Sequence, residues 1–186
     1  MHELAVARLQ GELISALEAA LKRRSFSHVT SEAPTHEELI PFVRAAAGVA
    51  DHGSLEPWRL IEIRGAARET IGKAFAKSGS SADKPMRASL LIAVVAIHKP
   101  SSKAPEWEQD AVASGVAHLL SLLLDEAGWG VFWRTGDPTR AKKVAKAHKL
   151  AKNEKLMGWL YVGGKPERSK PDKKDKLSLE KHLSVL

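Results

Sequence analysis

The sequence contains no cysteine among its 186 residues. This absence excludes disulfide bonds, metal sites built on thiolates and cysteine nucleophiles. A long apolar run is also missing, because the longest uncharged stretch, from about residue 111 to 124, is shorter than the roughly 20 residues that a helix needs to cross a bilayer. The segment from Met1 to Leu4 has no basic region followed by an apolar run, so no signal peptide is expected. The sequence therefore predicts a cytoplasmic protein without a membrane segment.

The common nucleotide-binding and catalytic motifs are missing as well. No G-x-G-x-x-G follows a predicted strand, no glycine-rich loop ends in Gly-Lys-Ser/Thr, and no G-x-S-x-G elbow is present. The stretch from His36 to Ile40 lacks the second histidine of a zinc-binding His-Glu-x-x-His helix. The eight histidines are scattered without the spacing of metal ligands, so we expect no metal site.

Positive charge is concentrated in one segment. The chain has a formal net charge of +7, from 29 Lys and Arg against 22 Asp and Glu. Residues 140–176 hold 13 Lys and Arg and 4 Asp and Glu, a surplus of +9, so the remaining residues sum to −2. Nucleic-acid binding would rest on this charge alone. A solvated lysine-rich face is therefore the favoured interpretation, and a nucleic-acid partner is not expected.

Hydrophobic periodicity divides the chain into helices and strands. Thr35 is expected to cap a helix that ends near Gly48, with Glu38 completing a capping box. Residues 90–97 are consecutive apolar residues rich in Val and Ile, which predicts a buried central strand. The other predicted helices are 4–21, 66–77, 106–127 and 139–150, and the other predicted strands are 59–64, 131–133 and 156–162.

These elements predict an α+β domain with helices layered on a central sheet. The length suits one domain, which we expect to span residues 1–165, followed by a basic C-terminal tail at 166–186. The middle of the long helix, residues 112–124, is apolar on nearly all sides. Because such a helix must be covered all round, we expect the sheet on one side of it and a partner subunit on the other.

Three short stretches carry side chains suited to ligand binding. Arg23-Arg24-Ser25 combines guanidinium forks with a hydroxyl donor, a set suited to phosphate. Trp133-Arg134-Thr135 places a flat ring, a guanidinium and a hydroxyl at a strand end. Asp51-His52 adds an acid and an imidazole in a loop that continues to Pro57-Trp58. Each stretch has a structural alternative: cations at a helix C-terminus, a buried indole beside an exposed arginine, and the start of a strand.

Taken in order, these stretches resemble the nitroreductase family of flavin enzymes, and in particular its small, single-domain bacterial branch. The resemblance runs from about residue 13 to 165 and includes further motifs. The matching stretches are Arg-Arg-Ser at 23–25, Ala-Pro-Thr at 33–35, Ala-Asp-His-x-x-x-x-Pro-Trp at 50–58, Pro-x-Trp-Glu-Gln at 105–109, Gly-x-x-Trp-Arg-Thr-Gly at 130–136 and Gly-Trp-Leu-Tyr-Val-Gly at 158–163.

The resemblance implies a fold, a cofactor and an assembly. The fold would be a central mixed, mostly antiparallel sheet flanked by helices, in an intertwined homodimer with FMN at the subunit interface. Arg23-Arg24-Ser25 would hold the phosphate and ribityl chain of FMN, and Trp133-Arg134-Thr135 would complete the pocket. Asp51 and His52 would approach the flavin from the other subunit.

Some positions depart from the family's pattern. Ser27 stands where the family often has Arg or Lys, and Glu56 stands where many members have Gln. A Gln side chain can donate to a flavin carbonyl, whereas an ionised Glu can only accept. The cation near the C-terminus that often reaches the phosphate in the family would here be Lys165 or Arg168.

The implied activity is hydride transfer from NAD(P)H through FMN to an electron-poor small molecule such as a nitroaromatic or a quinone. The flavin would carry the chemistry, and the protein would supply orientation and electrostatics. We name no catalytic acid or base, and His52 is the only candidate proton donor. The alternative is a non-enzymatic FMN- or nucleotide-binding protein with a degenerate site.

Overall fold

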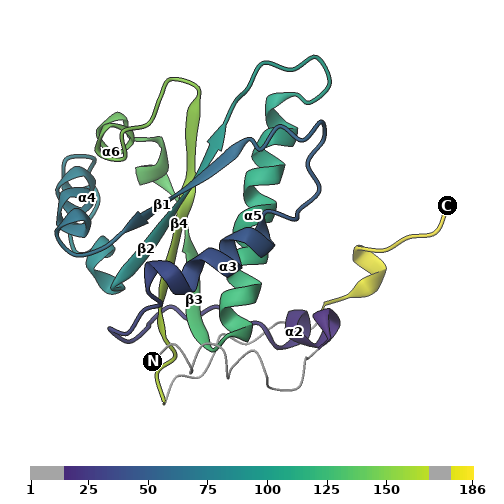
Figure 1. Cartoon of the computed structure of the whole chain (residues 1–186), viewed down its shortest axis with the longest axis horizontal. Coiled ribbons are helices and arrows are strands. Elements are labelled where there is room, and N and C mark those ends of the chain that lie inside the picture. The colour runs from purple at the N-terminus through teal and green to yellow at the C-terminus, as the bar shows by residue number, and fades with distance from the viewer. Residues whose placement is uncertain (1–14, 168–176) are drawn as a thin grey trace.

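Four strands form one antiparallel sheet at the centre of the molecule (Figure 1). The computed structural model describes residues 15–167 and 177–186. Within these ranges the strand order is β1-β2-β4-β3, and every neighbouring pair is antiparallel. The strands are β1 (Trp58–Ile63), β2 (Leu90–Ile97), β3 (Trp129–Arg134) and β4 (Glu154–Gly164). The architecture confirms the predicted α+β class, and each predicted strand is present.

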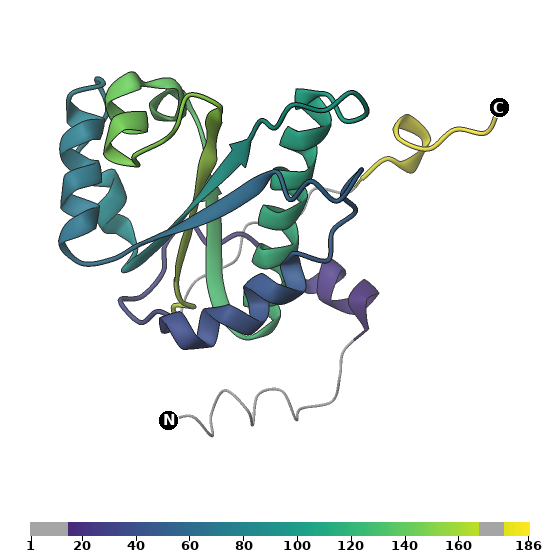
Figure 2. The same cartoon turned by 45° about the horizontal axis from the view of Figure 1, so that its top comes forward.

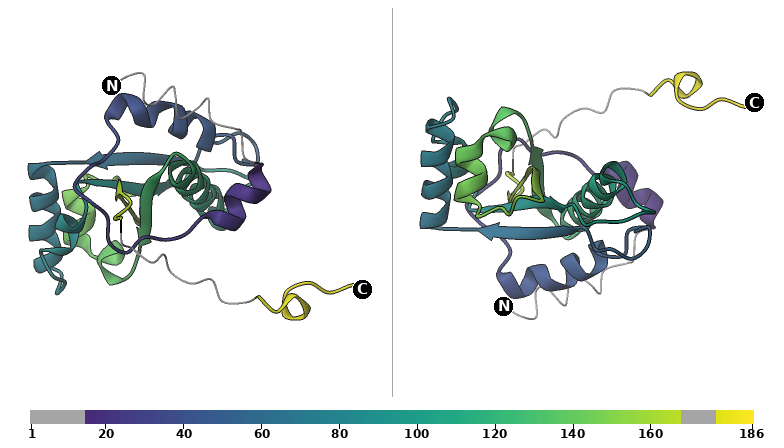
Figure 3. Two further views of the ribbon diagram at one scale, coloured as in Figure 1. Left: turned by 90° about the horizontal axis from the view of Figure 1, so that it is seen from below. Right: turned by 90° about the horizontal axis from the view of Figure 1, so that it is seen from above.

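Helices cover both faces of the sheet (Figure 2). One face is covered by α3 (His36–Ala46) and α5 (Glu106–Glu126), and the other by α4 (Ala66–Ala76) and α6 (Lys142–Ala147). The short helix α2 (Ala16–Lys22) lies near one end of α5. Three 3₁₀ turns complete the described elements: η1 (Lys84–Arg87), η2 (Asp137–Arg140) and η3 (Leu179–Lys181). Residues 177–186 lie apart from the sheet and its helices (Figure 3).

The helix starts follow local sequence signals. The Thr35 hydroxyl accepts from the backbone N–H of Glu38 at 3.2 Å, and the Glu38 carboxylate accepts from the backbone N–H of Thr35 at 2.8 Å. The predicted capping box is therefore confirmed. Ser15 caps α2 by accepting from the backbone N–H of Glu18. Of the helix predicted over residues 4–21, α2 represents the last part, and residues 4–14 lie outside the described residues.

Several predicted boundaries differ from the structure, and two of the differences have a clear physical reason. The lysine-rich helix predicted over residues 139–150 is split into η2 and α6, because Ala141 adopts an extended conformation with φ −79° and ψ 124° between them. The last strand includes Gly163 and Gly164, which the sequence predicts to end it. These glycines continue the strand because they pair with Gly130 and Trp129 of β3, while the chain near Thr30 crosses them closely. A Cβ on Gly163 would lie 2.5 Å from the Thr30 carbonyl oxygen, so only glycine permits this crossing.

The strand β2 lies at the centre of the core, as predicted. Its side chains alternate between the two faces of the sheet. The even-numbered residues from Leu90 to Val94 pack with α3 and α5. The odd-numbered residues from Leu91 to Val95 pack with α4 and α6. The sheet therefore separates two apolar cores, and each face of β3 and β4 contacts a different one.

The helix α5 is buried toward the sheet and open on its other side. Ala117 and Leu120 are fully buried, whereas His118 is exposed and Leu119 and Leu122 are partly exposed. One chain therefore does not cover α5 all round, and the partner subunit expected there stays a prediction. Among the helices of the described ranges, none is long and apolar enough to cross a membrane.

Candidate functional site

The segment that follows α2 lies along β3, the edge strand of the sheet. The backbone N–H of Phe26 donates to the carbonyl oxygen of Val131 at 3.0 Å. Further along, Nη2 of Arg134 donates to the carbonyl oxygen of Ser27 at 3.1 Å. These contacts place residues 26 and 27, which directly follow Arg23-Arg24-Ser25, against the β3 edge of the sheet.

The two arginines after α2 have different partners. Nη1 of Arg24 donates to the backbone carbonyl oxygens of Leu21, Lys22 and Arg23, at 2.7, 3.1 and 2.9 Å. Arg24 therefore satisfies the C-terminus of α2, which is the structural alternative to ligand binding. Arg23 instead directs its Nη1 to the hydroxyl oxygen of Ser25, at 3.4 Å. Arg23 and Ser25 thus form a pair of polar side chains beside the β3 edge.

Trp133 and Arg134 project from opposite sides of β3. The guanidinium carbon of Arg134 lies 4.4 and 5.1 Å from the ring centroids of Phe132 and Tyr161. The indole of Trp133 meets the ring of His118, on α5, edge-on at 5.0 Å. Within the described chain, Nε1 of Trp133 and Nε of Arg134 are buried without a hydrogen-bond partner. Because a buried unpaired donor costs free energy, the hydrogen bonding of this site is incomplete in the isolated chain.

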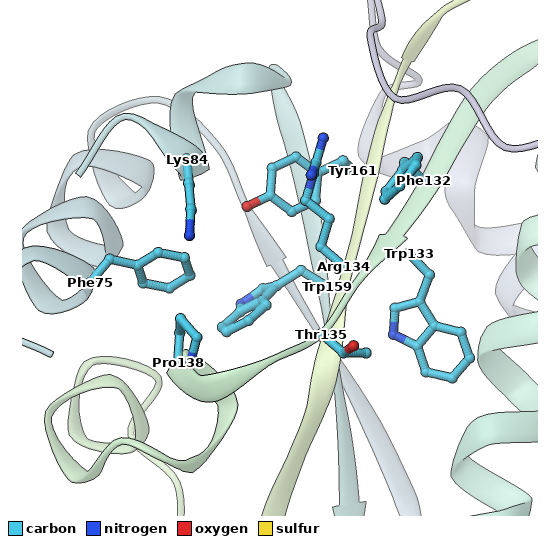
Figure 4. A pocket seen from close by; sticks show the side chains of 9 residues that line it. All are labelled: Phe75, Lys84, Phe132, Trp133, Arg134, Thr135, Pro138, Trp159 and Tyr161. Carbon is cyan, nitrogen blue, oxygen red and sulfur yellow. The ribbon is translucent and has the colours of Figure 1, made fainter. Parts of the chain in front are cut away.

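A cavity of about 270 Å³ opens beside Arg134 (Figure 4). Its walls are mostly aromatic, and Lys84 and Arg134 supply positive charge. Burial raises the pKa of Tyr161 to about 12, so its phenol stays protonated and can donate. The lining residues are Phe75, Lys84, Phe132, Trp133, Arg134, Thr135, Pro138, Trp159 and Tyr161, and they include no carboxylate. The cavity therefore has the charge to attract a ligand that carries negative charge.

Lys84 and Tyr161 are lining residues that sequence reasoning did not assign to the site. Lys84 follows a loop rich in Gly and Ser, and no motif marks it. Nζ of Lys84 donates to the hydroxyl oxygen of Ser80 at 2.8 Å. Tyr161 lies two residues after Trp159 on β4, and strand alternation places both on one face. That alternation is the signal that could have predicted an aromatic wall there.

Lys165, one of the two predicted phosphate-binding cations, lies at the opposite end of β3 from Arg134. Its Nζ donates to the backbone carbonyl oxygen of Asp125 at 2.8 Å. It also lies 3.0 Å from Oδ1 of Asp125, as an ion pair without hydrogen-bond geometry. The same Nζ is 5.3 Å from the ring centroid of Phe26, so Lys165 is held beside the segment after α2. The alternative cation, Arg168, lies outside the described residues.

Asp51 and His52 lie in a loop near the N-terminal end of α5. Asp51 accepts a backbone N–H from its own loop at 2.6 Å, and Nδ1 of His52 is 2.9 Å from Oε2 of Glu108. Asp125, whose partner Lys165 lies beside Phe26 in the segment after α2, is near the other end of α5. It is about 25 Å from Glu108 at a rise of ~1.5 Å per residue. One chain therefore does not bring Asp51 and His52 together with residues 23–25.

The fold is that of a small α+β protein, and a basic, aromatic cavity opens beside Arg134. The chain belongs to the nitroreductase family, since the model described as "Nitroreductase family" matches residues 20–164. A curated relative, the putative NAD(P)H nitroreductase YdjA of Escherichia coli strain K12, is 34% identical over 161 residues, which cover 81% of this chain and 88% of the relative. The family and the enzyme class expected from the sequence are confirmed.

Solved structures share the fold. The nitroreductase-like family protein from Bacillus cereus matches with a TM-score of 0.83 and 20% identity, over 94% of this chain and 97% of that chain. A variant of the FMN and NADPH-dependent nitroreductase NfnB from Sphingopyxis sp. strain HMH matches with a TM-score of 0.77 and 15% identity, over 92% of this chain and 99% of that chain. At these identities the likeness shows the fold alone, and it confirms the predicted nitroreductase-like architecture.

Proposed function

We propose that this chain is an FMN-dependent oxidoreductase that passes hydride from NAD(P)H through the flavin to electron-poor acceptors such as nitroaromatics or quinones. The observation that carries the proposal is the hydrogen bond between Ser27 and Arg134, which joins the segment after α2 to a basic, aromatic cavity. Two similar proteins support the cofactors, because one is named a putative NAD(P)H nitroreductase and the other an FMN and NADPH-dependent nitroreductase.

The side chains at this edge of the sheet fit FMN. A phosphate group needs cations and hydroxyl donors, and Arg23, Ser25 and Lys165 lie at or beside the segment after α2. A flat ring needs apolar walls and a few polar contacts, and the cavity offers aromatic rings together with Lys84 and Arg134. When bound, FMN supplies the two-electron chemistry that links NAD(P)H to the acceptor.

Arg134 holds a fixed positive charge at the cavity. Its guanidinium is oriented by the carbonyl oxygen of Ser27 and by the rings of Phe132 and Tyr161. A charge that is already in place stabilises negative charge developing nearby without having to reorganise. The predicted site includes Arg24, and we propose that its contribution is indirect, through the end of α2 that it caps.

We propose a homodimer in which Asp51 and His52 serve the site of the second copy. Their separation from residues 23–25 within one chain supports this arrangement, because a second copy is needed to bring the two groups together. The open side of α5 provides apolar surface for such an assembly, together with Leu17 and Leu21, which are 70% and 62% exposed on α2.

We also propose that residues 1–165 form one domain and that residues 166–186 form a basic tail. The family match ends at residue 164, where β4 also ends, and both observations support this boundary. Dependence on NAD(P)H supports the cytoplasmic location that the sequence predicts.

Titration of the purified protein with FMN tests the proposal. We expect flavin absorbance to accompany the protein, and added FMN to raise the melting temperature, because a ligand that binds only the native state stabilises it. The loaded protein should then oxidise NAD(P)H when a quinone or a nitroaromatic is present. A colourless protein whose melting temperature ignores FMN contradicts the proposal. Binding of FMN without NAD(P)H oxidation across several acceptors would instead indicate the non-enzymatic alternative.

A further inference from the structure

The loop that carries His52 has an unusual backbone. Gly53, Ser54 and Glu56 have positive φ values of 78°, 49° and 46°, and two of these residues are not glycine. Oδ2 of Asp51 closes the turn by accepting from the backbone N–H of Glu56 at 2.6 Å. Backbone conformations of this kind persist only where the surrounding contacts hold them, and they concentrate at functional sites.

The start of α5 supplies those contacts. The buried side chain of Gln109 accepts from the backbone N–H of Lys99 at 2.8 Å and donates to its carbonyl oxygen at 2.9 Å. Nζ of Lys99 in turn donates to the carbonyl oxygen of Leu55, in the loop. Glu108, the neighbour of Gln109, contacts His52 directly. Two adjacent residues of α5 therefore anchor this loop at two points.

The contact between Glu108 and His52 determines which ring nitrogen carries the hydrogen. An ionised carboxylate can only accept, so Nδ1 of His52 must donate across the 2.9 Å to Oε2 of Glu108. Neutral His52 then presents Nε2 as an acceptor, and protonated His52 presents it as a donor. The side chain of His52 is 55% exposed, and its Nε2 makes no hydrogen bond within the described part of the chain.

We propose that Glu108 is a positioning residue that holds His52 in one tautomer and orientation, with Nε2 directed to the flavin site of a second copy. This inference rests on the proposed function, because it gives His52 a task at that site. When a proton leaves Nε2 for the reduced acceptor, His52 becomes neutral. The hydrogen on Nδ1 stays on the ring and keeps its hydrogen bond to Glu108, and solvent returns a proton to Nε2. Carboxylates orient imidazoles in the same way at metal sites and in hydrolase triads.

Nitrogen-15 NMR of the histidine rings in the full chain tests the tautomer directly. At pH 8 we expect His52 of the wild type in the Nδ1–H form, and Glu108→Ala should move it toward the Nε2–H form. Glu106→Gln is the matched control, because Glu106 lies on the same helical turn but pairs with His98, at 3.4 Å. Its His52 signals should equal those of the wild type. A wild-type His52 in the Nε2–H form would overturn the proposal, whether or not the protein is an enzyme.

Steady-state kinetics test whether the positioning matters. We expect Glu108→Ala to lower kcat for acceptor reduction by about 10-fold. This is the lower end of the loss that follows when a carboxylate that orients a functional imidazole is removed. The KM for NAD(P)H and the FMN content should stay within twofold. Glu108→Gln should retain most of the activity, because its amide oxygen still accepts from Nδ1–H. Unchanged kcat in Glu108→Ala, or equal losses in both variants, would overturn the proposal.

The two tests separate this inference from the function on which it rests. A wild type that neither binds FMN nor oxidises NAD(P)H contradicts the proposed function, while the NMR result for His52 remains a test of Glu108 alone. A wild type that is active, with the kinetics of Glu108→Ala unchanged, removes Glu108 and leaves the function in place.

Discussion

Arg134 and Ser27 are 107 positions apart in the sequence, and a hydrogen bond of 3.1 Å joins them. The bond runs from Nη2 of Arg134 to the backbone carbonyl oxygen of Ser27, so any residue at position 27 could accept it. It fastens the segment after α2 to the edge strand of the sheet. The Nε of Arg134 is buried and has no hydrogen-bond partner in the described chain. Arg134 therefore makes a structural contact through Nη2 and still has an N–H free to donate at the cavity.

Replacement of Arg134 by lysine is expected to weaken FMN binding by about 1–3 kcal/mol, the range for a hydrogen bond to a charged group. Lysine keeps the charge but lacks the planar fork that reaches two directions at once. Flavin fluorescence in an equilibrium titration measures the change. Arg140→Lys, at an exposed position in η2, is the control and should bind FMN as the wild type does. Equal affinity in Arg134→Lys would remove the guanidinium from the site.

Arg23 and Arg24 are expected to differ although they are adjacent. Arg23→Ala should weaken FMN binding by ~1–3 kcal/mol, with little change in the melting temperature of the FMN-free protein. Arg24→Ala should lower that melting temperature instead, because its guanidinium satisfies three carbonyl groups at the end of α2. Thermal unfolding with and without FMN measures both effects. Equal loss of FMN affinity in the two variants would show that Arg24 contacts the ligand.

His148 is buried between Val144 and Trp159, in a neutral form. Its Nδ1 donates to the carbonyl oxygen of Val144 at 2.8 Å, and its Nε2 accepts from the indole N–H of Trp159 at 2.8 Å. Burial lowers the pKa of His148 below its ordinary value of 6.5. The unfolded chain therefore binds this proton at a higher pH than the folded chain does. The stability due to neutral His148 is present above pH 6.5 and is lost as the pH falls toward the lower pKa of the folded state.

His148→Gln is accordingly expected to lose less stability than the wild type between pH 8 and pH 5.5. Its stability at pH 8 should be lower by about 1–3 kcal/mol, because a buried hydrogen-bonded ring is replaced. Urea unfolding at the two pH values measures both quantities. His182→Gln, at an exposed position, is the control and should follow the wild type. The same pH dependence in His148→Gln and the wild type would show that another group causes the acid sensitivity.

Much of the framework could be predicted because its signals are local. Thr35 and Glu38 lie three residues apart, so their capping box is visible in the sequence and is confirmed by two hydrogen bonds. Residues 90–97 form an uninterrupted apolar run rich in Val and Ile, which is typical of a strand buried on both faces, and β2 is such a strand. The ordered motifs predicted the family for the same reason, since each motif is contiguous.

The remaining features depend on contacts between distant segments. No local pattern shows that β3 pairs with Gly163 and Gly164, which continues the last strand through its glycines, or that residue 30 crosses Gly163. No motif marks Lys84, which reaches the cavity because η1 packs beside α4. Arg24 contacts three carbonyl oxygens because of the way α2 ends. An arginine at this position could equally cap the helix or bind a ligand, and the sequence does not distinguish the two.

Leu17 and Leu21 lie one helical turn apart on α2 and are 70% and 62% exposed. Leu21→Glu is expected to shift the protein from dimer to monomer at micromolar concentration, because burying an unpaired charge in an apolar interface costs several kcal/mol. Its FMN content should fall as well, since Asp51 and His52 of the second copy are then lost. Sedimentation velocity and flavin absorbance measure the two effects, with Ala67→Glu, on the exposed surface of α4, as the control. A Leu21→Glu protein that stays dimeric and keeps FMN would place α2 outside the interface, and a monomeric wild type would contradict the dimer itself.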